Sequence, residues 1–137
     1  MRRLKVLLPL CLSTFLLMSC NEASTGAPST TSVPVAYQGT WKISLGGDLT
    51  GGGDMLVENG GAFTADWTMY AGGANYLTHI TGSVTSAGVV QGTITSDNSK
   101  IGDLAGKIDS AGITSTGTYS LSTPQNLSGP WNGLKSQ

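Results

Sequence analysis

A glycine two residues before a large apolar residue recurs along the chain, and it constrains the fold more than any other feature. The copies are Gly39-x-Trp41, Gly82-x-Val84, Gly92-x-Ile94, Gly106-x-Ile108, Gly117-x-Tyr119 and Gly129-x-Trp131. In a β-strand, residues two apart share a face, so each glycine is expected to face inward beside its large partner. The missing side chain lets a strand coil sharply and leaves room for a neighbouring ring. The pattern predicts a small, strongly curved β-sheet.

Apolar and polar residues alternate within the clearest segments, which is typical of strands with one buried and one wet face. Residues 39–45 and 63–70 both follow this period of two. Turn signals separate such segments at intervals of about 10 to 15 residues. Among these signals, Asn59-Gly60 suits positive φ at both positions, and Gly88 and Gly112 suit left-handed positions in hairpin loops. We expect eight strands, at about 38–46, 53–58, 62–70, 75–84, 89–96, 101–109, 113–121 and 128–135.

The connections between these strands are short, which favours antiparallel neighbours. Residues 82–88 and 106–112 are a local duplication, GSVTSAG and GKIDSAG, which indicates a hairpin as the repeating unit. We therefore predict an all-β fold, a single small antiparallel meander that forms a closed or nearly closed β-barrel. Closure removes the unpaired edges of the outer strands. A two-sheet sandwich is the alternative that periodicity leaves open.

The N-terminus has the pattern of an export signal. A basic start, RRLK at residues 2–5, precedes an apolar run over residues 6–18 that is short for a spanning helix. The run ends in Leu17-Met18-Ser19-Cys20, which resembles the lipobox of bacterial lipoproteins. The resemblance implies that residues 1–19 are a signal peptide that is removed. It also implies that Cys20 carries a thioether diacylglycerol and, in many bacteria, a further acyl chain such as palmitate on its amino group.

Two or three acyl chains anchor a protein to a membrane without a spanning segment. Asn21 stands where an aspartate resembles an inner-membrane retention signal, so we expect the bacterial outer membrane, with the domain in the periplasm or on the surface. Residues 20–36 comprise the lipidated cysteine and a flexible linker rich in Ser, Thr and Pro. The barrel domain is expected at 37–137. Cys11 lies in the removed segment, so no intramolecular disulfide is expected.

Charge and composition narrow the function classes. From Cys20 onward, four basic residues stand against eight acidic ones, a formal net charge of −4. We therefore expect no nucleic-acid partner. The mature chain has a single histidine, His79, which falls on the outer face, and it has no cysteine beyond Cys20. We expect no enzyme activity, no cofactor and no metal site. The glycine-rich loop with Asp48 and Asp54 has calcium-type oxygen donors, but a single copy favours a simple loop.

The first strands also resemble a known class of barrel. Gly39-Thr40-Trp41 followed by Leu45-Gly46, Met55-Leu56-Val57 and residues 60–64 is similar to the opening of avidin-type and, more loosely, lipocalin-type up-and-down barrels. The resemblance implies the architecture, with the first tryptophan plugging one barrel end. It does not imply biotin binding. The family's polar biotin contacts fall at Ile43 and Gly47, whose side chains form no hydrogen bond, and its tyrosine falls at Trp67.

Four aromatic residues are the candidate ligand-binding residues. Trp41, Trp67, Tyr119 and Trp131 fall on strands that would share a barrel interior, where they would form a cage for a flat or apolar ligand. An eight-stranded barrel is, however, just wide enough to be filled by its own side chains, and we favour this filled core. We expect a membrane-anchored lipoprotein that acts as a non-catalytic binding or interaction protein with a protein partner. The alternative is a lipocalin-like carrier of a small apolar or aromatic ligand.

Overall fold

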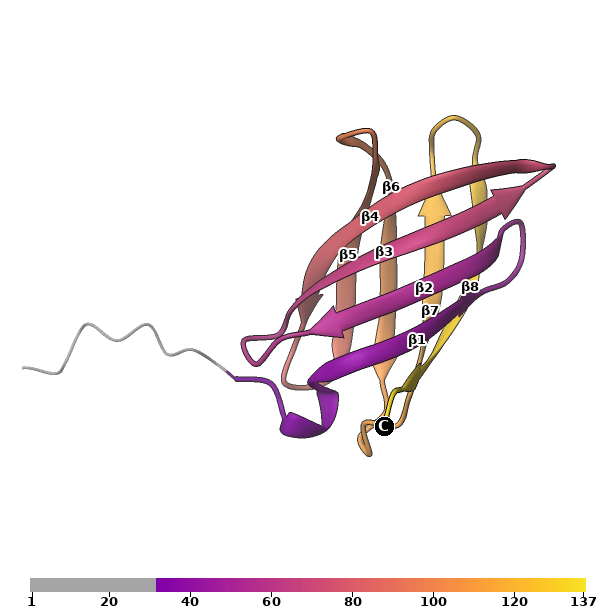
Figure 1. Ribbon diagram of the computed structural model, residues 1–137. Helices are drawn as coiled ribbons and strands as arrows, with labels where there is room; N and C mark the ends of the chain where they lie inside the picture. Colours follow the sequence, from indigo (N-terminus) through magenta and orange to yellow (C-terminus); the bar gives the residue numbers. More distant parts are fainter. Residues whose placement is uncertain (1–31) are drawn as a thin grey trace, which may run out of the picture.

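The computed structural model describes residues 32–137, which form a closed barrel of eight antiparallel strands (Figure 1). Each strand pairs with the next in the chain, and β8 pairs with β1. A short 3-10 helix, η1 (Val35–Tyr37), precedes the barrel. The strands are β1 (Gly39–Leu45), β2 (Thr50–Val57), β3 (Ala62–Ala71), β4 (Ala74–Val84), β5 (Val89–Ser96), β6 (Ser99–Ile108), β7 (Thr114–Leu121) and β8 (Leu127–Lys135). The predicted all-β meander and its closure are confirmed, and the sandwich is excluded.

Strand bounds agree with the expected ones to within three residues, and the largest difference is at the start of β2. Residues 51–53 are three glycines, which give no alternation to read, yet they pair with both β1 and β3. The close packing of these strands explains the glycines. A Cβ on Gly53 would lie 2.9 Å from Cδ1 of Trp67 and even closer to the backbone of β3. The glycines thus belong to the barrel wall, where Gly53 makes room for Trp67.

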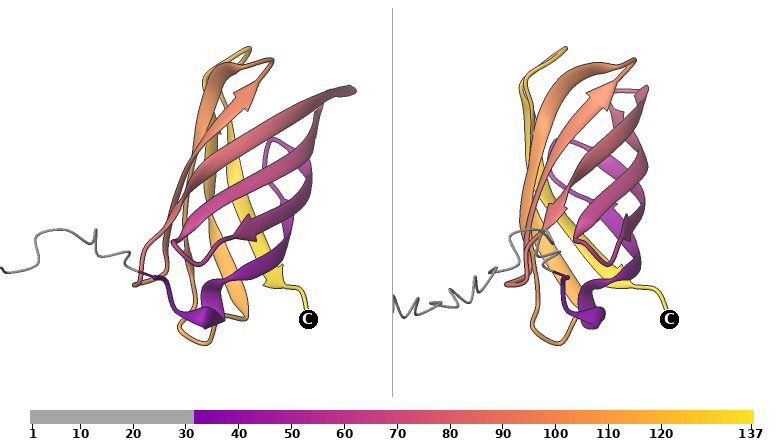
Figure 2. Two further views of the ribbon diagram at one scale, coloured as in Figure 1. Left: turned by 60° about the vertical axis from the view of Figure 1, so that its left-hand side comes forward. Right: turned by 90° about the vertical axis from the view of Figure 1, so that its left-hand side faces the viewer.

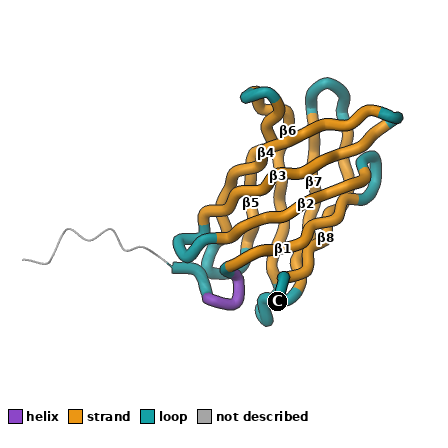
Figure 3. The backbone as a smooth tube through the Cα atoms, in the orientation of Figure 1, coloured by secondary structure: helices purple, strands orange, loops and turns teal. Residues whose placement is uncertain are grey.

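The connections gather at the two ends of the barrel (Figure 3). We call one end the entry end. It contains residues 33–37 and the turns at 58–61, 85–88 and 109–113. The other, which we call the far end, contains the connections at 46–49, 72–73, 97–98 and 122–126. Figure 2 shows the tilted strands running between these ends.

Residues 33–37 close the entry end. Val33 is 3% exposed and Tyr37 is 6% exposed. Each of the three turns places a left-handed glycine against this segment. Gly61 lies against Val33, Gly88 against Tyr37 and Gly112 against Ala36. The last residues of the expected linker, from Val33, therefore pack on the barrel that was expected from residue 37.

The turn between β2 and β3 differs in detail from the expectation. Positive φ falls at Gly61 (85°), and neither Asn59 nor Gly60 has it. The N–H of Gly61 donates to the carbonyl of Glu58 at 2.9 Å, and the N–H of Val33 donates to the carbonyl of Asn59 at 2.9 Å. Contact with the segment 33–37, through Val33, therefore shapes this turn. The left-handed glycines expected in the other two entry-end turns, at 88 and 112, are confirmed.

Inward glycines shape the core as the sequence pattern predicted. Gly82 of β4 pairs directly with Gly92 of β5. A Cβ on either residue would come within 2.8 Å of the Phe63 ring. Gly106 of β6 pairs with Gly117 of β7 in the same way, and a Cβ on either would overlap the indole of Trp131. Aromatic rings therefore occupy the space that paired glycines leave on neighbouring strands.

Candidate functional site

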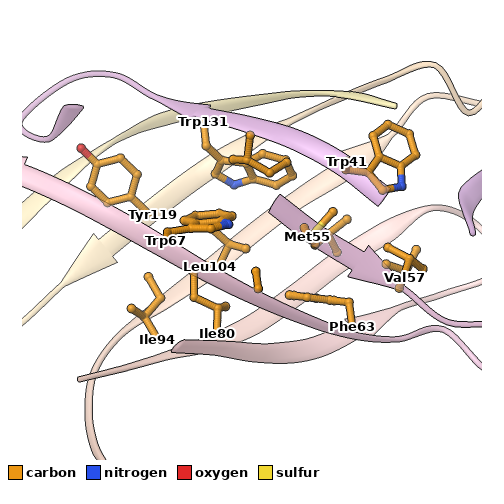
Figure 4. Close-up of a cluster of buried hydrophobic side chains, with 14 of the residues drawn as sticks. Trp41, Met55, Val57, Phe63, Trp67, Ile80, Ile94, Leu104, Tyr119 and Trp131 are labelled. Atoms are coloured by element: carbon orange, nitrogen blue, oxygen red, sulfur yellow. The ribbon is translucent and has the colours of Figure 1, made fainter. Parts of the chain in front are cut away.

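The four candidate ligand-binding residues all lie in the barrel core. Trp41, Trp67, Tyr119 and Trp131 come from β1, β3, β7 and β8, and each is at most 1% exposed. Figure 4 shows Trp67, Trp131 and Tyr119 in one region of the core and Trp41 beside Met55 and Val57. The structure thus brings together the residues that the sequence singled out. They belong to a single cluster of buried side chains.

Most of the polar atoms on these rings are bonded to the backbone. Trp41 Nε1 donates to the carbonyl of Tyr37 at 3.0 Å, and Trp131 Nε1 donates to the carbonyl of Ala105 at 3.0 Å. Trp41 thereby ties β1 to the segment that closes the entry end. Trp67 Nε1 is buried and has no hydrogen-bond partner within residues 32–137. Burying an N–H donor without a partner costs free energy, and the packing of the large Trp67 ring offsets this cost.

Tyr119 closes the far end together with the connection between β1 and β2. Its hydroxyl donates to the carbonyl of Gly46 at 2.7 Å and accepts from the N–H of Leu49 at 2.8 Å. Leu49 is fully buried beside it. Burial raises the pKa of the Tyr119 phenol, because the phenolate form loses its hydration there. The hydroxyl of Tyr119 is therefore occupied in holding a loop.

Exposure values decide between a cage and a core. A ring that lines a hollow keeps surface that a water-sized sphere can touch, even when the hollow is closed. Trp41 and Trp131 keep 0% and Trp67 and Tyr119 keep 1%, so almost no water-sized space adjoins these residues, although Trp67 is also among the residues that line a groove on the outer wall. The interior around the four aromatics is filled, as expected for a barrel of this strand number. The geometry favours the aromatic core.

The outer wall carries a groove of about 430 Å³ near the far end. It forms because β4 pairs with β3 from Ala74 to Ser83 but with β5 only from His79 to Val84. The ladder between β5 and β6 also shifts register between Ile94 and Thr95. The tips of the β3–β4 and β5–β6 hairpins consequently point apart (Figures 1 and 2). The groove lies where they diverge.

The groove combines an exposed apolar side chain with polar groups. Leu77 is 73% exposed, and residues 95–98 of the β5–β6 hairpin line the groove with it. Ser96 Oγ donates to the carbonyl of Leu77 at 3.0 Å, and Thr95 Oγ1 donates to the carbonyl of His79 at 2.9 Å. These hydroxyls bond the backbone of β4 at the point where its ladder with β5 ends.

His79 lies exposed on the outer wall at the edge of this groove, as the alternation of β4 predicted. Its Nδ1 lies 2.7 Å from Oδ1 of Asp66, the residue directly opposite on β3. Asp66 in turn lies opposite Asp54 on β2, and Asp54 forms an ion pair with Lys42 at 2.7 Å. The sequence analysis missed Asp66 as the partner of His79. The sequence alternation placed Asp66 on the outer face, but its pairing with His79 follows only from the register of β3 against β4.

The described residues hold no metal-type cluster. Within residues 32–137, no group of three or more His, Cys, Asp or Glu side chains is placed to bind a metal ion. Asp48 Oδ2 accepts from the N–H of Ser128 at 2.9 Å, and Asp54 is paired with Lys42. These contacts occupy the two aspartates that were weighed for calcium. In the same residues, no helix has the length and apolar character to cross a membrane.

Cys20, the expected lipidation site, lies outside the described residues, as does the expected signal peptide at 1–19. This chain matches no family model, no curated protein and no solved structure. The resemblance of its opening strands to avidin-type and lipocalin-type barrels therefore stays a prediction. The class of protein that the structure defines is an eight-stranded up-and-down β-barrel with a filled aromatic core.

Proposed function

We propose that this protein is a membrane-anchored lipoprotein, and that it is a non-catalytic binding protein that recognises a partner protein with its outer surface. The observation that carries the proposal is the filled interior around Trp41, Trp67 and Trp131. A barrel without internal space for a ligand would recognise a partner with its outer wall and its loops. The groove beside Leu77 is one of the hollows on that wall that pair an exposed apolar side chain with polar groups, and its apolar side chain is more exposed than Leu56 or Leu134 in two others.

The sequence supports the anchor, and the fold supports the orientation that an anchor would give. Twelve residues lie between Cys20 and Val33, and Val33 packs at the entry end. A chain of that length reaches at most ~45 Å when fully extended and spans ~20 Å on average as a flexible linker. The entry end would therefore lie toward the membrane. The groove near the far end would face away from it, toward a partner in the periplasm or outside the cell.

The carrier of a small apolar or aromatic ligand is the alternative prediction. It requires the core to open around Trp67, because the ring is 1% exposed. Opening would separate rings from the glycines on which they pack and would expose apolar surface to water. The packed geometry thus supports recognition on the outer surface over carriage inside the barrel.

Replacing Cys20 by serine is expected to leave an unprocessed and unlipidated precursor, because the acyl chains require the cysteine sulfur. Mass spectrometry of protein extracted from membranes checks this. The wild type should begin at Cys20 and carry the mass of its acyl chains, whereas Cys20→Ser should retain residues 1–19. Cys11→Ser is the matched control and should be processed like the wild type. A mature N-terminus without acyl mass at Cys20 in the wild type would reject the anchor.

A further inference from the structure

Exposed apolar side chains gather at one end of the barrel. Seven large hydrophobic residues are exposed within residues 32–137, and five of them lie on the half of the barrel next to the entry end. These five are Val35, Leu56, Val89, Ile113 and Leu134. Three of the five are at least 60% exposed, namely Val35, Ile113 and Leu134. We call these three residues the apolar tip.

Hydrogen bonds from the backbone and the side chain of Lys135 hold the apolar tip together. The N–H of Lys135, next to Leu134, donates to the carbonyl of Ile113 at 3.0 Å. The Nζ of the same lysine donates to the carbonyls of Val35 at 3.3 Å and Ala36 at 2.7 Å. Three segments that are distant in the sequence therefore meet around one lysine. An exposed apolar cluster held by a folded framework is typical of a surface that contacts another phase or another molecule.

The charge distribution distinguishes the entry end from the rest of the barrel. Near the entry end, two lysines balance two acidic residues, namely Lys107 and Lys135 with Glu58 and Asp109. Elsewhere in the described chain, two lysines stand against five aspartates, namely Lys42 and Lys100 with Asp48, Asp54, Asp66, Asp97 and Asp103. The excess negative charge thus lies away from the apolar tip. An anionic lipid surface repels such charge and tolerates a neutral end with exposed apolar side chains.

We propose that the apolar tip docks onto the lipid surface in which Cys20 is anchored. This inference rests on the proposed lipoprotein function. The chain outside the described residues joins the barrel at the entry end, so the short connection to Cys20 brings this end to the membrane. Amphipathic helices at a membrane surface bury their apolar face about 5 to 10 Å into the boundary between head groups and acyl chains, and exposed apolar side chains of a barrel tip can enter the same layer. Docking would hold the barrel upright, with the groove beside Leu77 directed away from the bilayer.

The test is a depth measurement on the full lipoprotein, reconstituted into vesicles of phosphatidylethanolamine and phosphatidylglycerol. In the mature chain, the sulfur of Cys20 would be held in the thioether to diacylglycerol, so an introduced cysteine is the one free thiol. An environment-sensitive fluorophore is attached to Ile113→Cys, or to Gln125→Cys at the far end as the matched control. Quencher-bearing lipids should quench the label at 113 several-fold more strongly than the label at 125, and the label at 113 should also shift its emission to the blue.

A variant that removes apolar side chains from the apolar tip tests whether these side chains cause the lipid quenching. In a protein labelled at Ala111→Cys, the additional substitutions Val35→Ser and Leu134→Ser should reduce lipid quenching several-fold while the protein still floats with the vesicles. Both replaced side chains are exposed, so the fold should persist, as checked by near-ultraviolet circular dichroism. Flotation with equal quenching at positions 113 and 125 would overturn docking alone. Failure of the wild-type protein to float would reject the lipid anchor and the docking with it.

Discussion

Replacing Trp67 by alanine is expected to lower the free energy of unfolding by about 3 to 5 kcal/mol, as for other large-to-small changes in a core. Trp67 is 1% exposed and packs against the glycine-rich start of β2. Its removal would leave a cavity that closed β-strands cannot fill by collapse. Native proteins have a total stability of about 5 to 15 kcal/mol, so the change would remove a large share of the stability of this domain. Urea unfolding followed by circular dichroism measures the change.

Trp67→Phe is the matched control for this prediction. It keeps an aromatic ring in the core and removes Nε1, the buried donor without a partner. Its cost should be clearly smaller than that of alanine, because less volume is lost and no hydrogen bond is broken. A Trp67→Ala protein with near-native stability would show that the ring lines accessible space. That result would support the carrier function.

The second large effect is expected from Gly117→Val, which should destabilise the barrel by about 1 to 3 kcal/mol or more. Gly117 faces Gly106 across β6 and β7, and the Trp131 indole covers the pair. A Cβ at position 117 would overlap both that ring and the carbonyl of Ala105. Either the ring must leave its position or the two strands must separate. A fall in melting temperature checks the prediction.

Gly60→Val provides the matched control within the same barrel. Gly60 lies in an entry-end turn, has ordinary negative φ, and would have no atom within 4 Å of an added Cβ. The melting temperature of this variant should stay close to that of the wild type. Equal melting temperatures for Gly117→Val and the wild type would contradict the glycine-and-ring packing and the inward register of β7.

Much of the fold could be predicted because its physical causes are local in sequence. Alternation of period two gives the two faces of each strand, and turn glycines mark where strands end. The inward glycines beside Ile94, Ile108 and Tyr119 indicated the coiling that closes a small barrel. The start of β2 was missed, because its glycines carry no side chains that alternate.

The remaining features depend on contacts between distant segments. Residues 33–37 pack at the entry end because three turns meet this segment, of which the β2–β3 turn contacts Val33. Nothing in a Ser, Thr and Pro-rich linker distinguishes Val33. The pairing of His79 with Asp66 needs the register of β3 against β4. Predicting the groove beside Leu77 requires knowing where β4 stops pairing with β5. The sequence alone identified the four aromatic residues. The choice between a ligand cage and a filled core required the packing around these residues.

The interior around the four aromatics is packed, and we propose that recognition occurs on the outside of the barrel. Because all three tryptophans are buried in the core, titration of the wild-type protein with apolar probes, followed by tryptophan emission, distinguishes a filled barrel from a hollow one. We expect blue-shifted emission, slow quenching by acrylamide, and no change in the spectrum as fatty acids or flat aromatic probes are added. A saturable shift or quenching of tryptophan emission by such a probe would place a ligand inside the barrel and contradict the account.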